Sequence, residues 1–103
     1  MIRSLLCALL FITSAQAVAD NDPLAGLKKG QPKDVAALIE RLVGCNHWSG
    51  EEPYDAERKR EISAAMAELK CDRLAADESA ALKRYAKNPS VLKALKDAKE
   101  MNY

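Results

Sequence analysis

Apolar side chains recur at helical spacing in four segments of the chain. In the first segment they occupy positions i, i+3, i+4 and i+7, which lie on one face of a helix: Val35, Leu38, Ile39 and Leu42. Pro32 suits the first turn of such a helix, and Gly44 is typical of the left-handed residue that ends one. The pattern therefore predicts a helix over residues 32–43.

A second helix is predicted over residues 55–71. Asp55 is a suitable N-cap, and the acidic side chain of Glu57 is favourable in a first turn. The apolar side chains again fall on one face: Ile62, Ala65, Met66 and Leu69. The basic run before this face is expected to point into solvent: Arg58, Lys59 and Arg60.

Two more helices are separated by Asn88 and Pro89. A capping asparagine followed by a proline in the first helical position is typical of a helix start. We therefore expect one helix over residues 75–87 and a last one over residues 89–101. The apolar residues of the two helices are Ala81, Leu82 and Tyr85, and then Val91, Leu92, Leu95 and Ala98.

These patterns predict an all-α protein with one small four-helix domain in residues 32–103. No segment after residue 17 alternates apolar and polar side chains as a strand does. Residues 18–31 are polar and lack a helical period, so we expect a flexible N-terminal tail there. The large apolar side chains expected in the core are Val35, Leu38, Ile39, Leu42, Ile62, Met66, Leu69, Leu82, Val91, Leu92 and Leu95. This core is small for a domain without a crosslink.

The first 17 residues have the pattern of a Sec-type secretory signal peptide. Arg3 gives a positively charged start, residues 4–13 are mostly apolar, and Ala15 and Ala17 are the small residues of a cleavage site. The apolar run is about half as long as a transmembrane helix requires. We expect cleavage after Ala17, or alternatively after Ala19, and a periplasmic or secreted protein with no transmembrane segment.

Cys45 and Cys71 remain after this cleavage, because Cys7 lies in the leader. Two cysteines in a small exported domain indicate a disulfide bond, since the compartment is oxidising. Closing a loop of about 26 residues stabilises a fold by roughly 3 kcal/mol in the chain-entropy model. The spacing is unlike the Cys-x-x-Cys of redox centres, and His47 is the only histidine that a metal site with these cysteines would have.

Length and charge exclude several classes of function. The 103 residues carry 16 Lys+Arg and 15 Asp+Glu, a balance unlike that of a nucleic-acid-binding protein. The length leaves no room for a two-domain enzyme. Acidic residues outnumber basic ones over residues 40–61, and the reverse holds over residues 83–100. This asymmetry is typical of solvated helix faces; the alternative is a basic end that contacts anionic lipid or an acidic partner.

The segment 45–55 combines residue types that are uncommon in a passive linker. Gly50 and Pro53 interrupt any helical period, so we expect a loop. Its aromatic side chains either pack over the helix ends or anchor a binding partner, with the acidic residues facing basic groups of that partner. A weak metal site and acid–base catalysis by His47 are the other two alternatives. The candidate binding residues are His47, Trp48, Glu51, Glu52, Tyr54 and Asp55.

Two stretches carry a resemblance to known proteins. The Cys-x-His-Trp-x-Gly-Glu-x-Pro-Tyr-Asp segment at residues 45–55 and the Leu-x-Cys-x-x-Leu at residues 69–74 resemble a group of small exported helical proteins of proteobacteria. Residues 62–85 are loosely similar to the LprI-type lysozyme inhibitors, which are small, secreted and helical. The matching residues are Cys71, Leu74, Asp77, Leu82 and Tyr85. That family usually has more cysteines, and no functional residue is carried over from it.

The leading functional hypothesis is a non-enzymatic periplasmic protein that binds another envelope protein through the segment 45–55. The resemblance and the acidic loop favour an inhibitor or immunity protein against a cell-wall hydrolase, because lysozymes are usually basic. One alternative is a small ligand or metal carrier that uses His47 and the acidic residues near it. Another is a structural envelope protein whose basic last helix meets anionic lipid. We predict no catalytic residue, no metal site and no cofactor.

Overall fold

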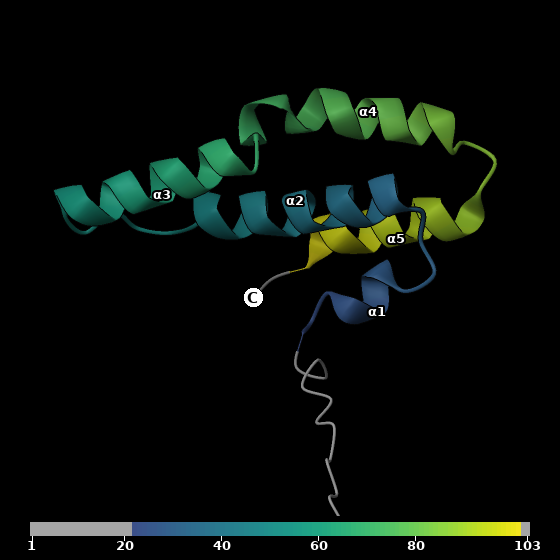
Figure 1. Cartoon of the computed structure of the whole chain (residues 1–103), viewed down its shortest axis with the longest axis horizontal. Helices are drawn as coiled ribbons and strands as arrows, with labels where there is room; N and C mark the ends of the chain where they lie inside the picture. The colour runs from purple at the N-terminus through teal and green to yellow at the C-terminus, as the bar shows by residue number, and fades with distance from the viewer. Residues whose placement is uncertain (1–21, 102–103) are drawn as a thin grey trace, which may run out of the picture.

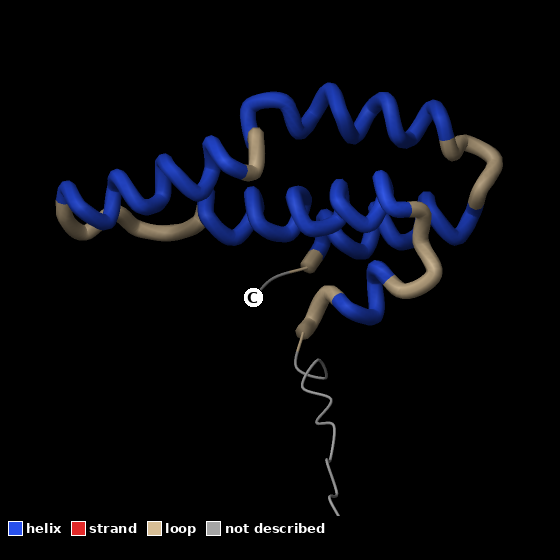
Figure 2. The backbone as a smooth tube through the Cα atoms, viewed as in Figure 1, coloured by secondary structure: helices blue, strands red, loops and turns tan. Residues whose placement is uncertain are grey.

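The computed structural model describes residues 22–101, and within this range the chain forms helices and no strand (Figures 1 and 2). This confirms the predicted all-α class with four helices of ordinary length. The predicted signal peptide and residues 18–21 of the predicted tail lie outside the described residues. None of the described helices combines the length and the hydropathy that crossing a membrane requires. The elements are α1 (Ala25–Lys28), α2 (Lys33–Ser49), α3 (Ala56–Glu68), the 3₁₀-helix η2 (Cys71–Arg73), α4 (Leu74–Arg84) and α5 (Pro89–Glu100).

The hydrophobic core lies between α2 and α5, and helix α2 is central because it contacts α1, α3, α4 and α5. The side chains of Ile39, Val35 and Leu95 are among the most completely buried in the described chain. Leu24 and Leu27 from the N-terminal side pack against this cluster. The fully buried set is Val35, Leu38, Ile39, Leu42, Val43, Cys45, Val91, Ala94, Leu95 and Ala98.

Residues 22–31 are not the irregular tail that their polar composition predicted. They contain α1, which packs on both α2 and α5. Lys28 fastens α1 to α2 through an ion pair in which its Nζ lies 2.6 Å from an oxygen of Glu40. Only two apolar side chains, Leu24 and Leu27, reach the core from this segment, which is too few to produce a helical period in the sequence.

The first long helix does not end at Gly44, and the prediction of a helix over residues 32–43 is wrong at this end. Helix α2 continues through Gly44 to Ser49 and ends at Gly50. A β-carbon at position 44 would lie 2.8 Å from Cδ1 of Leu69. The glycine therefore serves close packing of Leu69 against α2, and it costs the helix about 1 kcal/mol relative to alanine.

The caps predicted from the sequence are confirmed, whereas two helix ends differ. The Asp55 carboxylate accepts the backbone N–H of Arg58 at 2.7 Å, and the Asn88 side chain accepts that of Val91 at 3.2 Å. Helix α3 ends at residue 68 rather than 71, because Lys70 adopts a left-handed conformation with φ 54°. Helix α4 covers 74–84 rather than 75–87, and the chain turns before the Asn88 cap.

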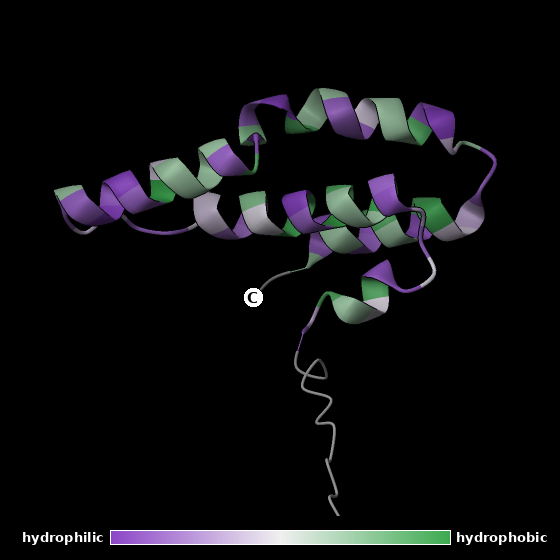
Figure 3. Ribbon diagram, viewed as in Figure 1, coloured by the Kyte–Doolittle hydropathy of each residue, from purple (hydrophilic) through white to green (hydrophobic). Residues whose placement is uncertain are grey.

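Helices α3 and α4 bury no side chain completely, which corrects the predicted core. Each of them packs on one side of α2 and leaves its other side to solvent, so their apolar faces are only partly covered. Leu82 of α4 is 40% exposed. Figure 3 shows that the first half of α3 is hydrophilic and its second half more hydrophobic. The predicted core residues that are only partly buried are Ile62, Met66, Leu69 and Leu92.

Candidate functional site

Helix α3 forms an arm that extends beyond the end of α2 (Figure 1). We define the arm as residues 50–68, which comprise the connection 50–55 and α3. The connection leaves the end of α2 in an extended course, and α3 then returns toward α2. The first half of α3 therefore has no long helix beside it, which explains why it is polar and why it buries no side chain.

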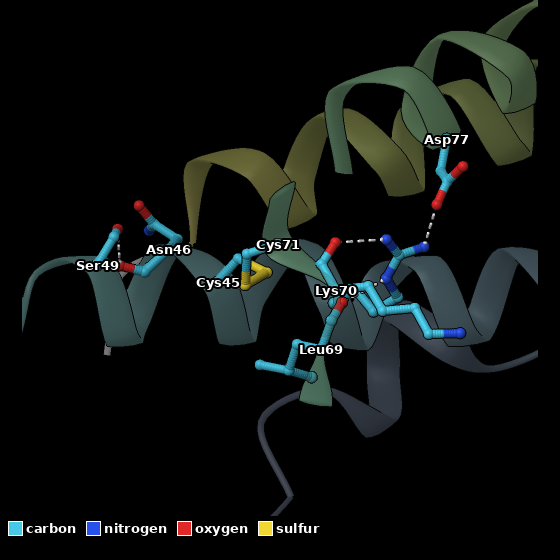
Figure 4. The surroundings of a disulfide bond; sticks show 8 residues. Cys45, Asn46, Ser49, Leu69, Lys70, Cys71 and Asp77 are labelled. Carbon is cyan, nitrogen blue, oxygen red and sulfur yellow. Dashed lines mark hydrogen bonds and ion pairs between the residues drawn. A yellow bond between two sulfur atoms is a disulfide. The ribbon is translucent and has the colours of Figure 1, made fainter. Parts of the chain in front are cut away.

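A group of contacts on α2 holds the C-terminal end of α3 (Figure 4). The Cys45–Cys71 disulfide joins α2 to η2, which follows α3, with 5.7 Å between the Cα atoms, and confirms the predicted pairing. Leu69 packs on the bare backbone of Gly44, as described above. These contacts fix the C-terminal end of α3, whereas the start of α3 projects beyond the end of α2 (Figure 1).

Arg41 of α2 completes this group of contacts. Its Nε donates to the carbonyl of Leu69 at 2.7 Å and its Nη2 donates to the carbonyl of Lys70 at 3.0 Å. Its Nη1 lies 2.9 Å from a carboxylate oxygen of Asp77 on α4. The last carbonyls of a helix lack partners within the helix, so the guanidinium supplies the donors that the end of α3 needs.

At the base of the arm, four side chains from α2, the connection 50–55 and α3 meet. The guanidinium of Arg58 lies 5.3 Å from the ring centre of Trp48, within the range of a cation–π interaction. Its Nη2 lies 3.4 Å from Glu51, whose same oxygen is 3.3 Å from Nε2 of His47. Nη1 of Arg58 also contacts Glu61 at 3.2 Å. We call His47, Trp48, Glu51 and Arg58 the Trp48 cluster.

The charge on Arg58 is well supported in this cluster. Burial is the largest influence on its pKa and lowers it, but the hydrogen bond to Glu61 and the carboxylate of Glu51 together raise the pKa above its ordinary value. Among the polar atoms of the described residues, Nε of Arg58 is buried without a hydrogen-bond partner. Arg58 therefore remains a cation in contact with the indole of Trp48, and this contact connects α3 to the last turn of α2.

The structure separates the predicted binding residues into three groups. His47, Trp48 and Glu51 come together in the Trp48 cluster, although His47 and Trp48 lie on α2 and not on the predicted loop. Asp55 is the N-cap of α3, which is a structural role. Glu52 and Tyr54 lie in the projecting connection, and Tyr54 is 79% exposed, so the alternative in which Tyr54 packs over the helices is wrong.

Arg58 is the member of the cluster that the sequence did not identify. The sequence pattern predicts a solvated face for Arg58, Lys59 and Arg60, and this prediction is right only for Lys59 and Arg60, which are exposed. The position of Arg58 in the sequence could have indicated this role. It is the third residue after the N-cap Asp55, and a side chain there lies close to the segment that enters the helix.

A second polar group joins α4 to α2. The hydroxyl of Tyr85 donates to the Asp34 carboxylate at 2.8 Å, and Nη1 of Arg84 lies 3.1 Å from the same carboxylate. The tyrosine hydrogen bond is the main reason why the pKa of Asp34 is lowered, and it raises the pKa of Tyr85 in turn. Asp77 and Tyr85 are thus contact residues between helices.

The two ion pairs between α2 and α4 are reciprocal. Each helix carries an aspartate, two small or apolar residues and an arginine at spacing i, i+3, i+4 and i+7, and the aspartate of one helix pairs with the arginine of the other. A groove of about 320 Å³ lies between the pairs. Its lining is Asp34, Ala37, Leu38 and Arg41 with Asp77, Ala80, Ala81 and Arg84.

No family model, no curated protein and no solved structure matches this chain in the three comparisons. Within residues 22–101, no three side chains of the His, Cys, Asp and Glu types gather as metal ligands do. The alternative of a metal carrier based on His47 gains no support from the structure.

Proposed function

We propose that this protein is an exported, non-enzymatic binding module that contacts another protein of the cell envelope through the projecting end of its arm. The observation that supports this most is the exposure of Tyr54, at 79% the highest among the large hydrophobic residues of the described chain. Tyrosine is a frequent anchor of protein interfaces because it buries a large apolar area at a low cost in conformational entropy.

The surroundings of Tyr54 favour a partner with a basic surface. Glu52 precedes it and Glu57 follows it in the first turn of α3, and both side chains are exposed. Arg58 does not neutralise this end, because its guanidinium is held by Glu51 and Glu61. Lysine or arginine side chains of a partner would meet an aromatic ring and carboxylates together.

The arm is also suited to binding because its shape is fixed in advance. The disulfide and Arg41 hold the end of α3, and the Trp48 cluster holds its beginning to α2. Ordering of a loop on binding costs free energy, and a pre-ordered loop avoids much of this cost. A cell-wall hydrolase with a basic surface, bound by an inhibitor or immunity protein, fits this chemistry.

Binding to a panel of cell-wall hydrolases tests the proposal. Chicken-type, goose-type and invertebrate-type lysozymes and a lytic transglycosylase are immobilised, and the wild type is compared with Tyr54→Ala and Glu52→Lys. We expect each variant to weaken the dissociation constant of a bound hydrolase about tenfold or more. The matched controls are Leu82→Ala, at the other exposed large apolar residue, and Glu100→Lys on α5.

The outcomes separate the two parts of the proposal. Equal losses in the arm variants and in the controls would remove the arm from the argument. A wild type that binds none of these enzymes would refute the assignment to cell-wall hydrolases. The lipid-contact alternative is less favoured, because two of the α5 lysines are engaged: Lys93 with Asp97 at 2.7 Å and Lys99 with Glu78 at 3.1 Å.

A further inference from the structure

We propose that the Cys45–Cys71 disulfide is opened at Cys71 by a protein dithiol of the Cys-x-x-Cys kind, and that this reduction releases the arm while the α2–α5 core stays folded. The two cysteines differ in their access to solvent. Cys45 is 6% exposed and lies within α2, whereas Cys71 is partly exposed and begins the short helix η2. An attacking thiolate must reach one of the two sulfurs, and Cys71 is the more exposed of the two residues.

Two grooves lead to Cys71. One, of about 410 Å³, lies between the helices and is lined by both cysteines together with Leu42, Met66 and Leu74. The other, of about 650 Å³, is lined by Met66, Ala67, Cys71 and Asp72 and not by Cys45. The two grooves share Met66 and Cys71 and therefore adjoin. The second groove approaches the bond from the side of Cys71, which is the side that an exchange releasing Cys45 requires.

The exchange is balanced in atoms and electrons. The first thiolate of the dithiol attacks Sγ of Cys71, the bond to Sγ of Cys45 breaks, and Cys45 leaves as a thiolate that takes up a proton. The second thiolate of the dithiol then attacks the mixed disulfide and releases Cys71, which also takes up a proton. The dithiol becomes a disulfide, and this chain gains two electrons and two protons.

The arm responds to this reduction because it has few other attachments. No side chain of α3 is fully buried, and Lys70, which links α3 to η2, is held at a positive φ that lysine disfavours. What remains is the packing of Leu69 on Gly44, the Arg41 hydrogen bonds and the Trp48 cluster. All the buried hydrophobic residues of the described chain lie on α2 and α5, which the reduction does not disconnect. Local opening of weakly packed elements, with an intact core, is the expected behaviour.

A trapping experiment tests the site of attack. The oxidised full chain is incubated with a thioredoxin whose second active-site cysteine is replaced by serine, so that the mixed disulfide accumulates. Peptide mapping by mass spectrometry is expected to place the adduct on Cys71 in about a tenfold excess over Cys45. An adduct chiefly on Cys45 contradicts the proposal, and so does the absence of any adduct under conditions in which a small phosphine reduces the bond.

Hydrogen exchange tests the consequence. On reduction we expect amides of residues 56–68 to exchange about tenfold faster or more, whereas those of residues 35–43 and 91–98 change by less than about threefold. The variant with both Cys45→Ala and Cys71→Ala is expected to show the reduced pattern without reductant and to ignore reductant. Loss of protection throughout the chain, or failure of this variant to fold, overturns the proposal, as does an unchanged α3. These outcomes do not depend on the proposed function, because neither measurement involves a binding partner.

Discussion

Replacement of Arg41 by methionine is expected to destabilise the protein far more than replacement of the similarly paired Arg84. The Arg41 guanidinium makes two hydrogen bonds to the carbonyls of Leu69 and Lys70, and its side chain is 20% exposed. Charge-assisted hydrogen bonds of this kind contribute about 1.5–3 kcal/mol each when buried, and partial exposure places these two at the low end. The ion pair with the more exposed Asp77 adds about 0.5 kcal/mol or less.

The free energy of unfolding should therefore fall by about 3 kcal/mol in Arg41→Met, since methionine preserves the apolar stem but donates no hydrogen bond. Arg84→Met is the matched control: its guanidinium also pairs with an aspartate across α2 and α4 but is 69% exposed, and it should cost about 0.5 kcal/mol or less. Urea unfolding followed by far-ultraviolet circular dichroism measures both. Equal losses in the two variants would refute the idea that Arg41 anchors the arm.

A double-mutant cycle with Asp77→Asn separates the two roles of Arg41. If the carbonyl bonds dominate, the coupling energy between positions 41 and 77 is about 0.5 kcal/mol and decreases in high salt. A coupling energy close to the full decrease in the free energy of unfolding of Arg41→Met would instead show that Arg41 stabilises the protein through its ion pair with Asp77 on α4. In that case the arm would depend on the disulfide, the packing of Leu69 and the Trp48 cluster.

Lys70, Gly44 and the Tyr85–Asp34 pair each have a local geometry that determines the effect of a substitution. Lys70→Gly should stabilise the protein by about 1 kcal/mol, because glycine adopts the positive φ without a steric cost, and thermal unfolding measures the gain. Gly26→Ala should raise the free energy of unfolding by up to about 1 kcal/mol, because alanine favours a helix and nothing obstructs its β-carbon there. Gly44→Ala should give no such increase, because its β-carbon would meet Leu69. Equal increases at both positions would contradict the packing of Leu69 on Gly44. In Tyr85→Phe the lowered pKa of Asp34 should return toward 3.8, as carboxyl NMR titration reports. The wild type should lose the contribution of Asp34 as the pH falls through this lowered pKa, and that of Tyr85 as the pH rises through its raised pKa above 10.0.

Local signals in the sequence predicted helix starts correctly where a residue type has one common structural role, such as capping a helix. Asp55 and Asn88 cap helices because their side chains accept a backbone N–H, and Pro89 fits a first turn wherever it occurs. The cysteine pair followed from the expected compartment. These features depend on a few neighbouring residues, so they can be recognised without knowledge of the packing.

Features that depend on distant partners could not be predicted in this way. Glycine is typical of helix ends, but Gly44 lies within α2 and allows close contact with Leu69, which is 25 positions away in the chain. Ile62 and Met66 have a helical period, yet the arm projects and leaves them partly exposed. The role of Arg58 depends on Trp48 and Glu51 from the preceding helix and connection. A period shows which face of a helix is apolar, and only the fold shows how much of that face is covered.

The central claim is that the arm is a pre-formed surface, and backbone and indole ¹⁵N relaxation of the oxidised protein tests it most directly. We expect order parameters near 0.85 for the amides of residues 50–55 and for the indole N–H of Trp48, similar to those of the buried segment 35–43. Order parameters below about 0.6 in residues 50–55, together with a mobile indole, would show a flexible loop. That result would contradict the account, because the arm would then have to become ordered on binding, which costs free energy.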